Sequence, residues 1–416
     1  MDTRPNRARL ALRLVTSIAP RVISAGGPLI FGGGLIFLLP VTEVGEIVEI
    51  SAICSALGVA GRLGVDQELF LAGARHGYQA SSRKLVLTLS AFVFAVGGAL
   101  GFCAAIFGLG VYASSALIAC GSIAASGIMV AAFRIQRWHQ VADLSEHGAI
   151  YLLAFILIAL DSILGIGAKS SALFSSAALL LFLFQLALAM WFVQFSGDNR
   201  SSGIEVDKKL VGRSMLNAFP VTTANYLAGQ GVVALFAAFL APAELAAFNL
   251  IVRSVSAIRI ISVYTNSRLG GRLLLPNRHG IRPGAVRIAK ALSVRNARLA
   301  TVYVVGCCAL LIYPFDVLSA GQPMEMIAFL GFCCLEIYII RTAAANMFLI
   351  ALGQGHYLTA IALTFLGMIA LGRSLGVDDL GSALILLSSA SFLRYGLIHI
   401  LANRFISLDS SRGLSV

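Results

Sequence analysis

Six arginines lie inside long apolar stretches of this 416-residue chain: Arg21, Arg62, Arg253, Arg259, Arg341 and Arg394. The guanidinium group presents planar pairs of N–H donors that match the oxygens of phosphate and carboxylate groups. An arginine inside a bilayer costs about 2.5–3.5 kcal/mol on insertion scales, so each needs a physical reason. Arg21 and Arg253 lie deepest, and neither has a carboxylate three or four positions away. We therefore expect these two above all to bind an anionic group.

The other four arginines have a second interpretation. Arg259, Arg341 and Arg394 fall in the inner half of their apolar runs, and their side chains could extend to the inner membrane surface. Arg62 is spaced i,i+4 from Asp66, so the two could form a structural ion pair on one helix face.

Three carboxylates are candidates for binding a coupling proton or sodium ion. Asp161 and Glu336 lie within apolar runs and have no oppositely charged neighbour three or four residues away, whereas Glu49 lies near the outer end of its run. An acid inside the membrane is a candidate ion-coupling site, and its alternative is a partner on another helix. We predict Asp161, Glu336 and Glu49 as the ion-coupling residues.

The elements that must position these residues are membrane helices. The chain is 58% apolar and 12% charged with a mean hydropathy of +0.89, which excludes soluble enzymes, nucleic-acid modules, disordered tails and disulfide scaffolds. A spanning helix needs about 20 apolar residues, and a β-barrel would show short alternating segments instead. The sequence predicts an all-α polytopic membrane protein with about twelve spans, at 13–39, 45–72, 85–108, 111–133, 148–168, 171–196, 211–240, 244–268, 298–318, 324–351, 357–373 and 380–402.

The positive charges indicate the orientation of these spans. With the N-terminus placed in the cytoplasm, 23 of the 31 Lys and Arg residues fall on the inner side and only Lys169 and Arg373 on the outer side. Cytoplasmic loops of membrane proteins carry this excess. We expect both termini in the cytoplasm, the apolar run after Arg13 to be a retained first span, and most of the +12 net charge to reflect topology.

The chain also shows two similar halves. Ser17-Ile18-Ala19-Pro20 in the first span corresponds to Asn217-Ala218-Phe219-Pro220 in the seventh, and the turn Glu43-Val44-Gly45 corresponds to Glu244-Leu245-Ala246, both at an offset of 200 or 201 residues. Two six-span halves that start on the same side form a parallel repeat. We predict an N-terminal six-helix lobe at 1–197, a cytoplasmic linker at 198–210 and a C-terminal six-helix lobe at 211–416.

These turns carry a resemblance to a known family. Glu43-Val44-Gly45, Glu244-Leu245-Ala246 and the segment Gly64-Val65-Asp66 resemble the turns of the polysaccharide and O-antigen flippases, which belong to the multidrug/oligosaccharidyl-lipid/polysaccharide exporter superfamily. The resemblance implies two six-helix lobes around a cavity lined by spans one, two, seven and eight. It also implies alternating-access flipping of a polyprenyl-diphosphate-linked oligosaccharide across the bacterial inner membrane during surface polysaccharide biosynthesis.

The same resemblance places four arginines in cavity-lining spans. It implies that Arg21, Arg62, Arg253 and Arg259 bind the anionic head group of the lipid-linked substrate. Asn225 and Gln230 in span seven could bind sugar hydroxyls, or equally could form hydrogen bonds between helices. The expected partners are this substrate, membrane lipids, a coupling proton or sodium ion and a polysaccharide polymerase, with no nucleic acid.

Two other function classes stay open. An ion-coupled multidrug or small-solute exporter would share the superfamily fold, although many cations in the cavity favour an anionic substrate. A membrane enzyme would need a long outward loop that carries catalytic residues, whereas every outward connection expected here is short. The chain also has no P-loop, G-x-S-x-G or H-E-x-x-H motif, which argues against an enzyme. The seven cysteines all lie in apolar runs and suit packing. We therefore expect no catalytic residue, no cofactor and no metal site.

Overall fold

The computed structural model describes residues 26–62, 65, 80–108, 110–135, 141–142, 147–195, 219, 223–229, 231–259, 284–318, 323–352 and 354–413. Every regular element within these ranges is helical, which confirms the predicted all-α class. The chain divides into two compact units. The first comprises Met1–Pro40 and Glu46–Thr223, and the second comprises Val41–Gly45 and Ala224–Val416.

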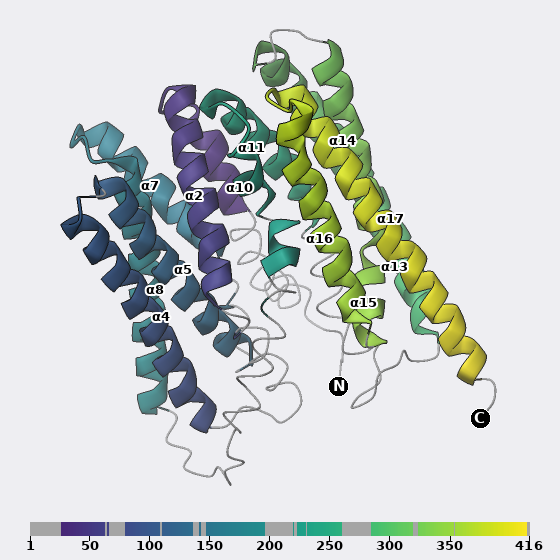
Figure 1. Cartoon of the computed structure of the whole chain (residues 1–416), viewed down its shortest axis with the longest axis horizontal. Helices are drawn as coiled ribbons and strands as arrows, with labels where there is room; N and C mark the ends of the chain where they lie inside the picture. The colour runs from purple at the N-terminus through teal and green to yellow at the C-terminus, as the bar shows by residue number, and fades with distance from the viewer. Residues whose placement is uncertain are drawn as a thin grey trace, which may run out of the picture. The chain divides into compact units, whose positions relative to one another are not determined.

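The helices of the first half follow the predicted spans closely. Residues 26–35 are helical, as expected for the first span. The helices that follow in Figure 1 are α2 (Val41–Gly61), α4 (Ala80–Ile106), α5 (Gly110–Ile135), α7 (His147–Leu164) and α8 (Ser170–Phe195). The largest difference is at the end of the second predicted span, because α2 ends at Gly61, immediately before Arg62.

The second half contains shorter and interrupted helices. They are α10 (Val232–Phe236), α11 (Pro242–Ser256), α13 (Ala285–Leu318), α14 (Pro323–Thr342), α15 (Ala344–Ala351), α16 (Gly355–Gly372), the 3-10 turn η1 (Arg373–Leu375) and α17 (Leu380–Gly413). The seventh predicted span is broken: 223–227 are helical, a turn follows at Ala228 and Gly229, and α10 begins at Val232.

Length and composition mark six of the described helical segments as able to cross a membrane: Val41–Gly61, Val86–Ile106, Tyr112–Phe133, Ser170–Trp191, Glu325–Asn346 and Leu380–Leu408. Large apolar side chains are exposed on several helices, such as Phe92 on α4 and Leu310 on α13, at 63% and 77%. An apolar exterior of this kind suits lipid better than water.

Close contacts between small residues hold α4 and α5 together in the first unit. A Cβ atom added at Gly97 would lie 2.6 Å from the Cα atom of Gly121, whereas one added at the adjacent Gly98 would meet no atom within 4 Å. Gly97 and Gly121 therefore allow the two helix backbones to approach closely. Ser55 on α2 also forms a 2.9 Å hydrogen bond with the hydroxyl of Tyr151 on α7.

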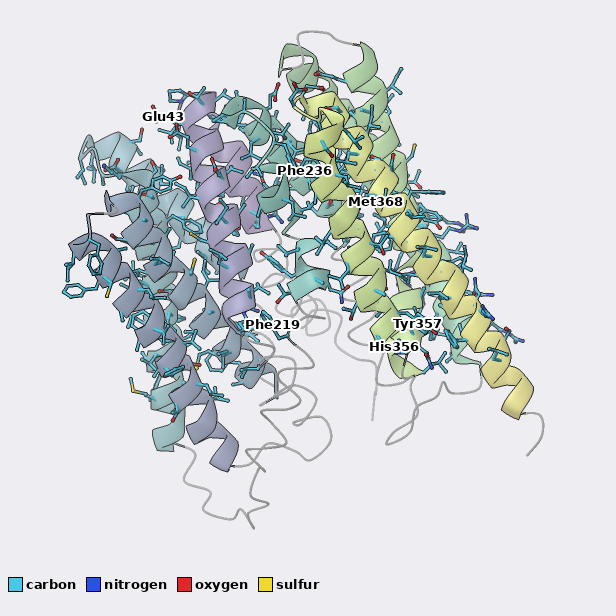
Figure 2. The ribbon with its side chains drawn as sticks, in the orientation of Figure 1. Glu43, Phe219, Phe236, His356, Tyr357 and Met368 are labelled. Carbon is cyan, nitrogen blue, oxygen red and sulfur yellow. The ribbon has the colours of Figure 1, made fainter. Side chains whose placement is uncertain are left out.

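Aromatic side chains join α16 to α17 in the second unit. His356 and Tyr357, labelled in Figure 2, lie in the first turn of α16 with ring centroids 4.3 Å apart. The Tyr357 ring also lies 5.6 Å from that of Phe405 on α17. Because α17 packs against α14, α15 and α16, its inward side chains reach several elements of this unit.

Candidate functional site

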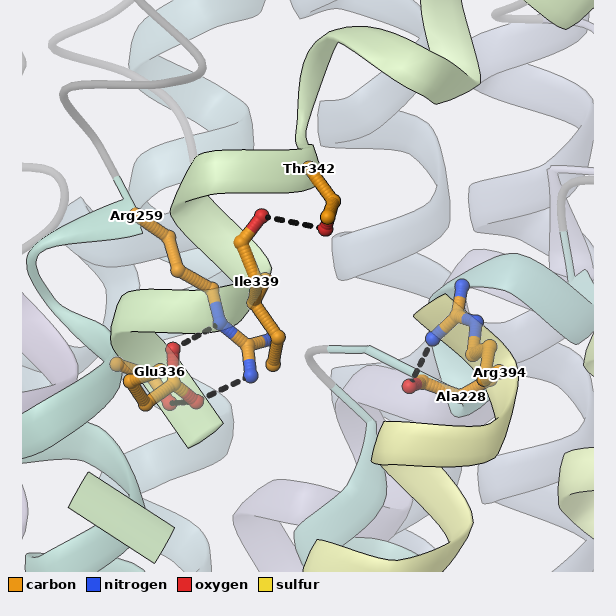
Figure 3. A network of polar contacts seen from close by, with 7 residues as sticks. Ala228, Arg259, Glu336, Ile339, Thr342 and Arg394 are labelled. Carbon is orange, nitrogen blue, oxygen red and sulfur yellow. Dashed lines mark hydrogen bonds and ion pairs between the residues drawn. The ribbon is translucent and has the colours of Figure 1, made fainter. Parts of the chain in front are cut away.

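A buried ion pair connects the end of α11 to α14 in the second unit. Arg259, three residues beyond α11, donates from Nε to Glu336 Oε2 at 2.7 Å and from Nη2 to Glu336 Oε1. Ser256 donates a third hydrogen bond to Glu336 Oε1 at 3.0 Å. The Glu336 side chain is fully buried, and Arg259 is 27% exposed. This bidentate pair, drawn in Figure 3, neutralises both charges inside the helix bundle.

A second buried arginine lies on α17 and has no carboxylate partner among the residues that the structure describes. Arg394 is only 6% exposed. Its Nη1 donates to the carbonyl oxygen of Ala228, at the break in the seventh span (Figure 3). Its Nη2 donates to Asn225 Oδ1 at 3.3 Å. The guanidinium carbon lies 5.6 Å from the ring centre of Phe365 and 5.3 Å from that of Tyr395. Each of these four contacting groups is uncharged.

The other predicted arginines that the structure describes each contact a different group. Arg253 on α11 makes a long hydrogen bond of 3.4 Å from Nε to Asn249 Oδ1, one turn earlier on the same helix. Arg62 lies against α5, because a Cβ atom added at Gly127 would approach its guanidinium carbon to 2.1 Å. Arg341, for which we considered a surface position, is exposed.

The predicted ion-coupling acids differ in their surroundings. Asp161 lies in the last turn of α7, and its Oδ1 accepts a 3.0 Å hydrogen bond from the backbone N–H of Ala168 just after the helix. This carboxylate therefore stabilises the backbone conformation of the segment that follows α7. Glu49 is half-buried on α2. Glu336 pairs with Arg259, which lies three residues beyond α11, so a distant segment supplies the partner for this acid.

Several predicted residues lie outside the described residues. They are Arg21 and Gln230 among the expected substrate-binding residues, and Asp66, the expected partner of Arg62. Of the six expected substrate-binding residues, Asn225 and Arg259 lie in the second unit together with Arg253, but they contact different groups. Asn225 forms the interhelical hydrogen bond to Arg394 that was the alternative to binding a sugar hydroxyl.

Arg394 is the residue whose setting the sequence failed to indicate. One interpretation of the sequence extends its side chain to the membrane surface, whereas the structure buries it inside the second unit. Its partners, Asn225 and Ala228, lie 169 and 166 residues away in the sequence. The spacing of residues near Arg394 in the sequence therefore does not indicate these two partners. In the sequence, Gly229 and Gly231 beside Ala228 are the features that could have indicated an irregular backbone near this arginine.

Comparison with solved structures identifies the fold. The multidrug transporter DinF-BH, of the MATE type and solved in complex with a ligand, superposes with a TM-score of 0.56 and 16% identity over 95% of this chain and 94% of that one. An inward-facing multidrug resistance MATE transporter of the MOP superfamily gives a TM-score of 0.54 at 12% identity, covering 95% of this chain and 99% of that one.

A third structure with this fold is a MOP superfamily transporter from Pyrococcus furiosus, for which a reverse polarity of the binding pocket suggests a different function. It has a TM-score of 0.51 and 12% identity, covering 96% of this chain and 95% of that one. No protein-family model matches the sequence, and no curated protein matches it. The chain thus has the fold of MATE transporters of the MOP superfamily over nearly its whole length.

Proposed function

We propose that this chain is a membrane transporter that exports an amphiphilic organic substrate by alternating access. The observation that carries the proposal is the similarity of fold, which extends over 95% of this chain and 94% or more of two multidrug transporters. Similar transporters are known in inward-facing and outward-facing conformations, so this architecture supports both states. We place the protein in the bacterial inner membrane with both termini in the cytoplasm.

The first candidate substrate is a drug or another small organic molecule. Its support is that the solved structures named above include two multidrug transporters. The turns that resemble those of the polysaccharide flippases are compatible with this candidate, because multidrug exporters and polysaccharide flippases share one superfamily fold.

The second candidate substrate is an anionic, lipid-linked oligosaccharide. Its support is the set of arginines in the helices, above all Arg394, whose buried guanidinium contacts uncharged groups in the described part of the chain. A diphosphate group would complement such cations. A polysaccharide polymerase would then be the expected partner.

Transport must be coupled to a source of energy, and the sequence has no nucleotide-binding motif. We propose an ion gradient, with Glu336 or Glu49 as the residue that binds the proton or sodium ion. Asp161 is less suited to this role, because its carboxylate already accepts a hydrogen bond from the backbone after α7. Glu336 would have to separate from Arg259 to bind an ion.

A deletion strain tests the proposal with two measurements. The strain is compared with the same strain complemented by the full-length gene, and both are assayed for intracellular accumulation of dyes and antibiotics and for polyprenyl-linked glycans. Raised dye accumulation would support the multidrug exporter, and accumulation of a lipid-linked intermediate with loss of surface glycan would support the flippase. Unchanged dyes, antibiotics and glycans would contradict the proposed transport function.

A further inference from the structure

The broken seventh span and α17 together enclose an unusual charge. Arg394 is 94% removed from solvent, and among the described residues no carboxylate contacts it. A buried ion is costly unless it is paired, since its hydration is lost. Arg259 shows the usual solution in the same unit, because Glu336 neutralises it. Arg394 therefore keeps a positive charge that no described residue of the second unit neutralises by an ion pair.

The groups around Arg394 compensate this charge only in part. A guanidinium has five N–H donors, and here the carbonyl of Ala228 and the amide oxygen of Asn225 each accept one. Its Nε is buried and has no hydrogen-bond partner in the described structure. The rings of Phe365 and Tyr395 lie within reach of a cation–π interaction but accept no further hydrogen bond. The guanidinium of Arg394 therefore keeps N–H donors and a positive charge that an anion could bind.

The backbone beside Arg394 is irregular where a membrane helix would be expected to continue. The chain turns at Ala228 and Gly229 between a short helical segment and α10. Irregular backbone at membrane depth is tolerated where it is enclosed by protein or lines a cavity, and interrupted helices commonly build the substrate sites of transporters. The uncompensated arginine thus lies at the kind of backbone feature that binds ligands.

We propose that Arg394, with Asn225 and the interrupted backbone at Ala228, binds an anionic phosphate or carboxylate group. This inference deepens the proposed function, on which it rests, by naming the charge class of the substrate. The anion would accept hydrogen bonds from the guanidinium N–H groups that have no acceptor among the described residues, and it would neutralise the charge that those residues leave uncompensated. The bond to Ala228 would couple anion binding to the conformation of the seventh span.

A binding experiment on the full-length protein tests this inference apart from transport. Inorganic diphosphate is titrated into purified protein to detect binding of a free anion. Phosphatidic acid is added to phosphatidylcholine nanodiscs, and bound lipid is counted by native mass spectrometry to detect binding of a head group. We expect saturable binding in at least one of these measurements. Arg394→Gln should weaken it about tenfold or more, because charge-assisted hydrogen bonds are lost. The matched control is Arg341→Gln, an exposed arginine, which should bind as the wild type does.

A second variant keeps the test decisive if Arg394→Gln fails to fold. Asn225→Asp places a carboxylate beside Nη2, where the amide oxygen now lies at 3.3 Å, and so supplies an internal anion. It should fold at least as stably as the wild type and bind the added anion about tenfold less tightly or worse. A purely structural Arg394 predicts unchanged anion binding in this variant.

The outcomes separate the two proposals. Absence of binding in both measurements, or unchanged affinity in either folded variant, would overturn the assignment of Arg394. If cells still export a dye in that case, the proposed transport function stands. Anion binding with no transport of any substrate would instead overturn the proposed function.

Discussion

Replacing Glu336 by Gln would remove one charge of the buried ion pair and leave the other in place. Glu336 is fully buried and accepts hydrogen bonds from Ser256 and, at two oxygens, from Arg259. Breaking a buried pair by removing one partner costs about 3–5 kcal/mol, because the remaining charge is uncompensated. Arg259 is 27% exposed, so we expect the lower end of this range, about 3 kcal/mol.

Thermal unfolding of the full-length protein in detergent measures this loss. For a cooperative unit of 150–250 residues, the size class of Ala224–Val416, 1 kcal/mol lowers Tm by about 2–4 °C. The Glu336→Gln variant should therefore unfold about 6–12 °C below the wild type. Asp378→Asn serves as the control, since Asp378 is exposed and in the same unit. It should leave Tm within about 1 °C.

A double variant separates the ion pair from the packing around it. Arg259→Met combined with Glu336→Leu removes both charges and should recover most of the stability, because the desolvation of both ions is also removed. A Glu336→Gln variant with the Tm of the wild type would refute the reasoning, as would a double variant less stable than the single one.

Three further predictions concern packing, helix proximity and pH. Gly97→Ala should destabilise the protein by about 1–3 kcal/mol, because its Cβ would meet the α5 backbone at 2.6 Å; Gly98→Ala is the matched control with open space, and thermal unfolding compares the two. Cys308 and Cys333, whose sulfur atoms lie 3.5 Å apart, should form a disulfide between α13 and α14 on treatment with a membrane-permeable disulfide oxidant; peptide mass spectrometry detects it, and its absence would contradict this helix packing. Desolvation alone would raise the pKa of Asp379, but hydrogen bonds from the first turn of α17 lower it below its usual value. Its charge therefore stabilises the fold above about pH 4 and this contribution is lost as the pH falls further, so Tm of the wild type should drop more steeply between pH 5 and pH 3 than that of Asp379→Ala, and parallel curves would exclude the effect.

The sequence predicted the helices well because their signal is local. An apolar run of about 20 residues must form backbone hydrogen bonds within itself in a membrane, so composition alone locates it. Helices such as α8 (Ser170–Phe195) and α16 (Gly355–Gly372) begin and end within two residues of the predicted spans. The seventh span was predicted as continuous, because the short polar stretch Gly229-Gln230-Gly231 lies within a longer run that is apolar on average.

The contacts of the charged residues could not be predicted to the same extent. Arg259 pairs with Glu336, which is 77 positions away in the sequence. Arg394 donates to the backbone carbonyl of Ala228, and every residue has such a carbonyl, so the sequence does not indicate which one is the acceptor. Periodicity places a side chain on a helix face, but the neighbour of that face depends on tertiary packing. This is why the sequence could name these arginines as candidates and could not choose Arg394 among them.

Transport by the purified protein in liposomes tests the central claim most directly. Under an imposed proton or sodium gradient, we expect gradient-dependent movement of a cationic dye or of a fluorescent prenyl diphosphate, and the anion-binding role of Arg394 predicts the prenyl diphosphate. Protein-free liposomes, and proteoliposomes without an imposed gradient, are the controls. Gradient-dependent transport of either probe would agree with the proposed function, and transport of neither by folded protein would contradict it.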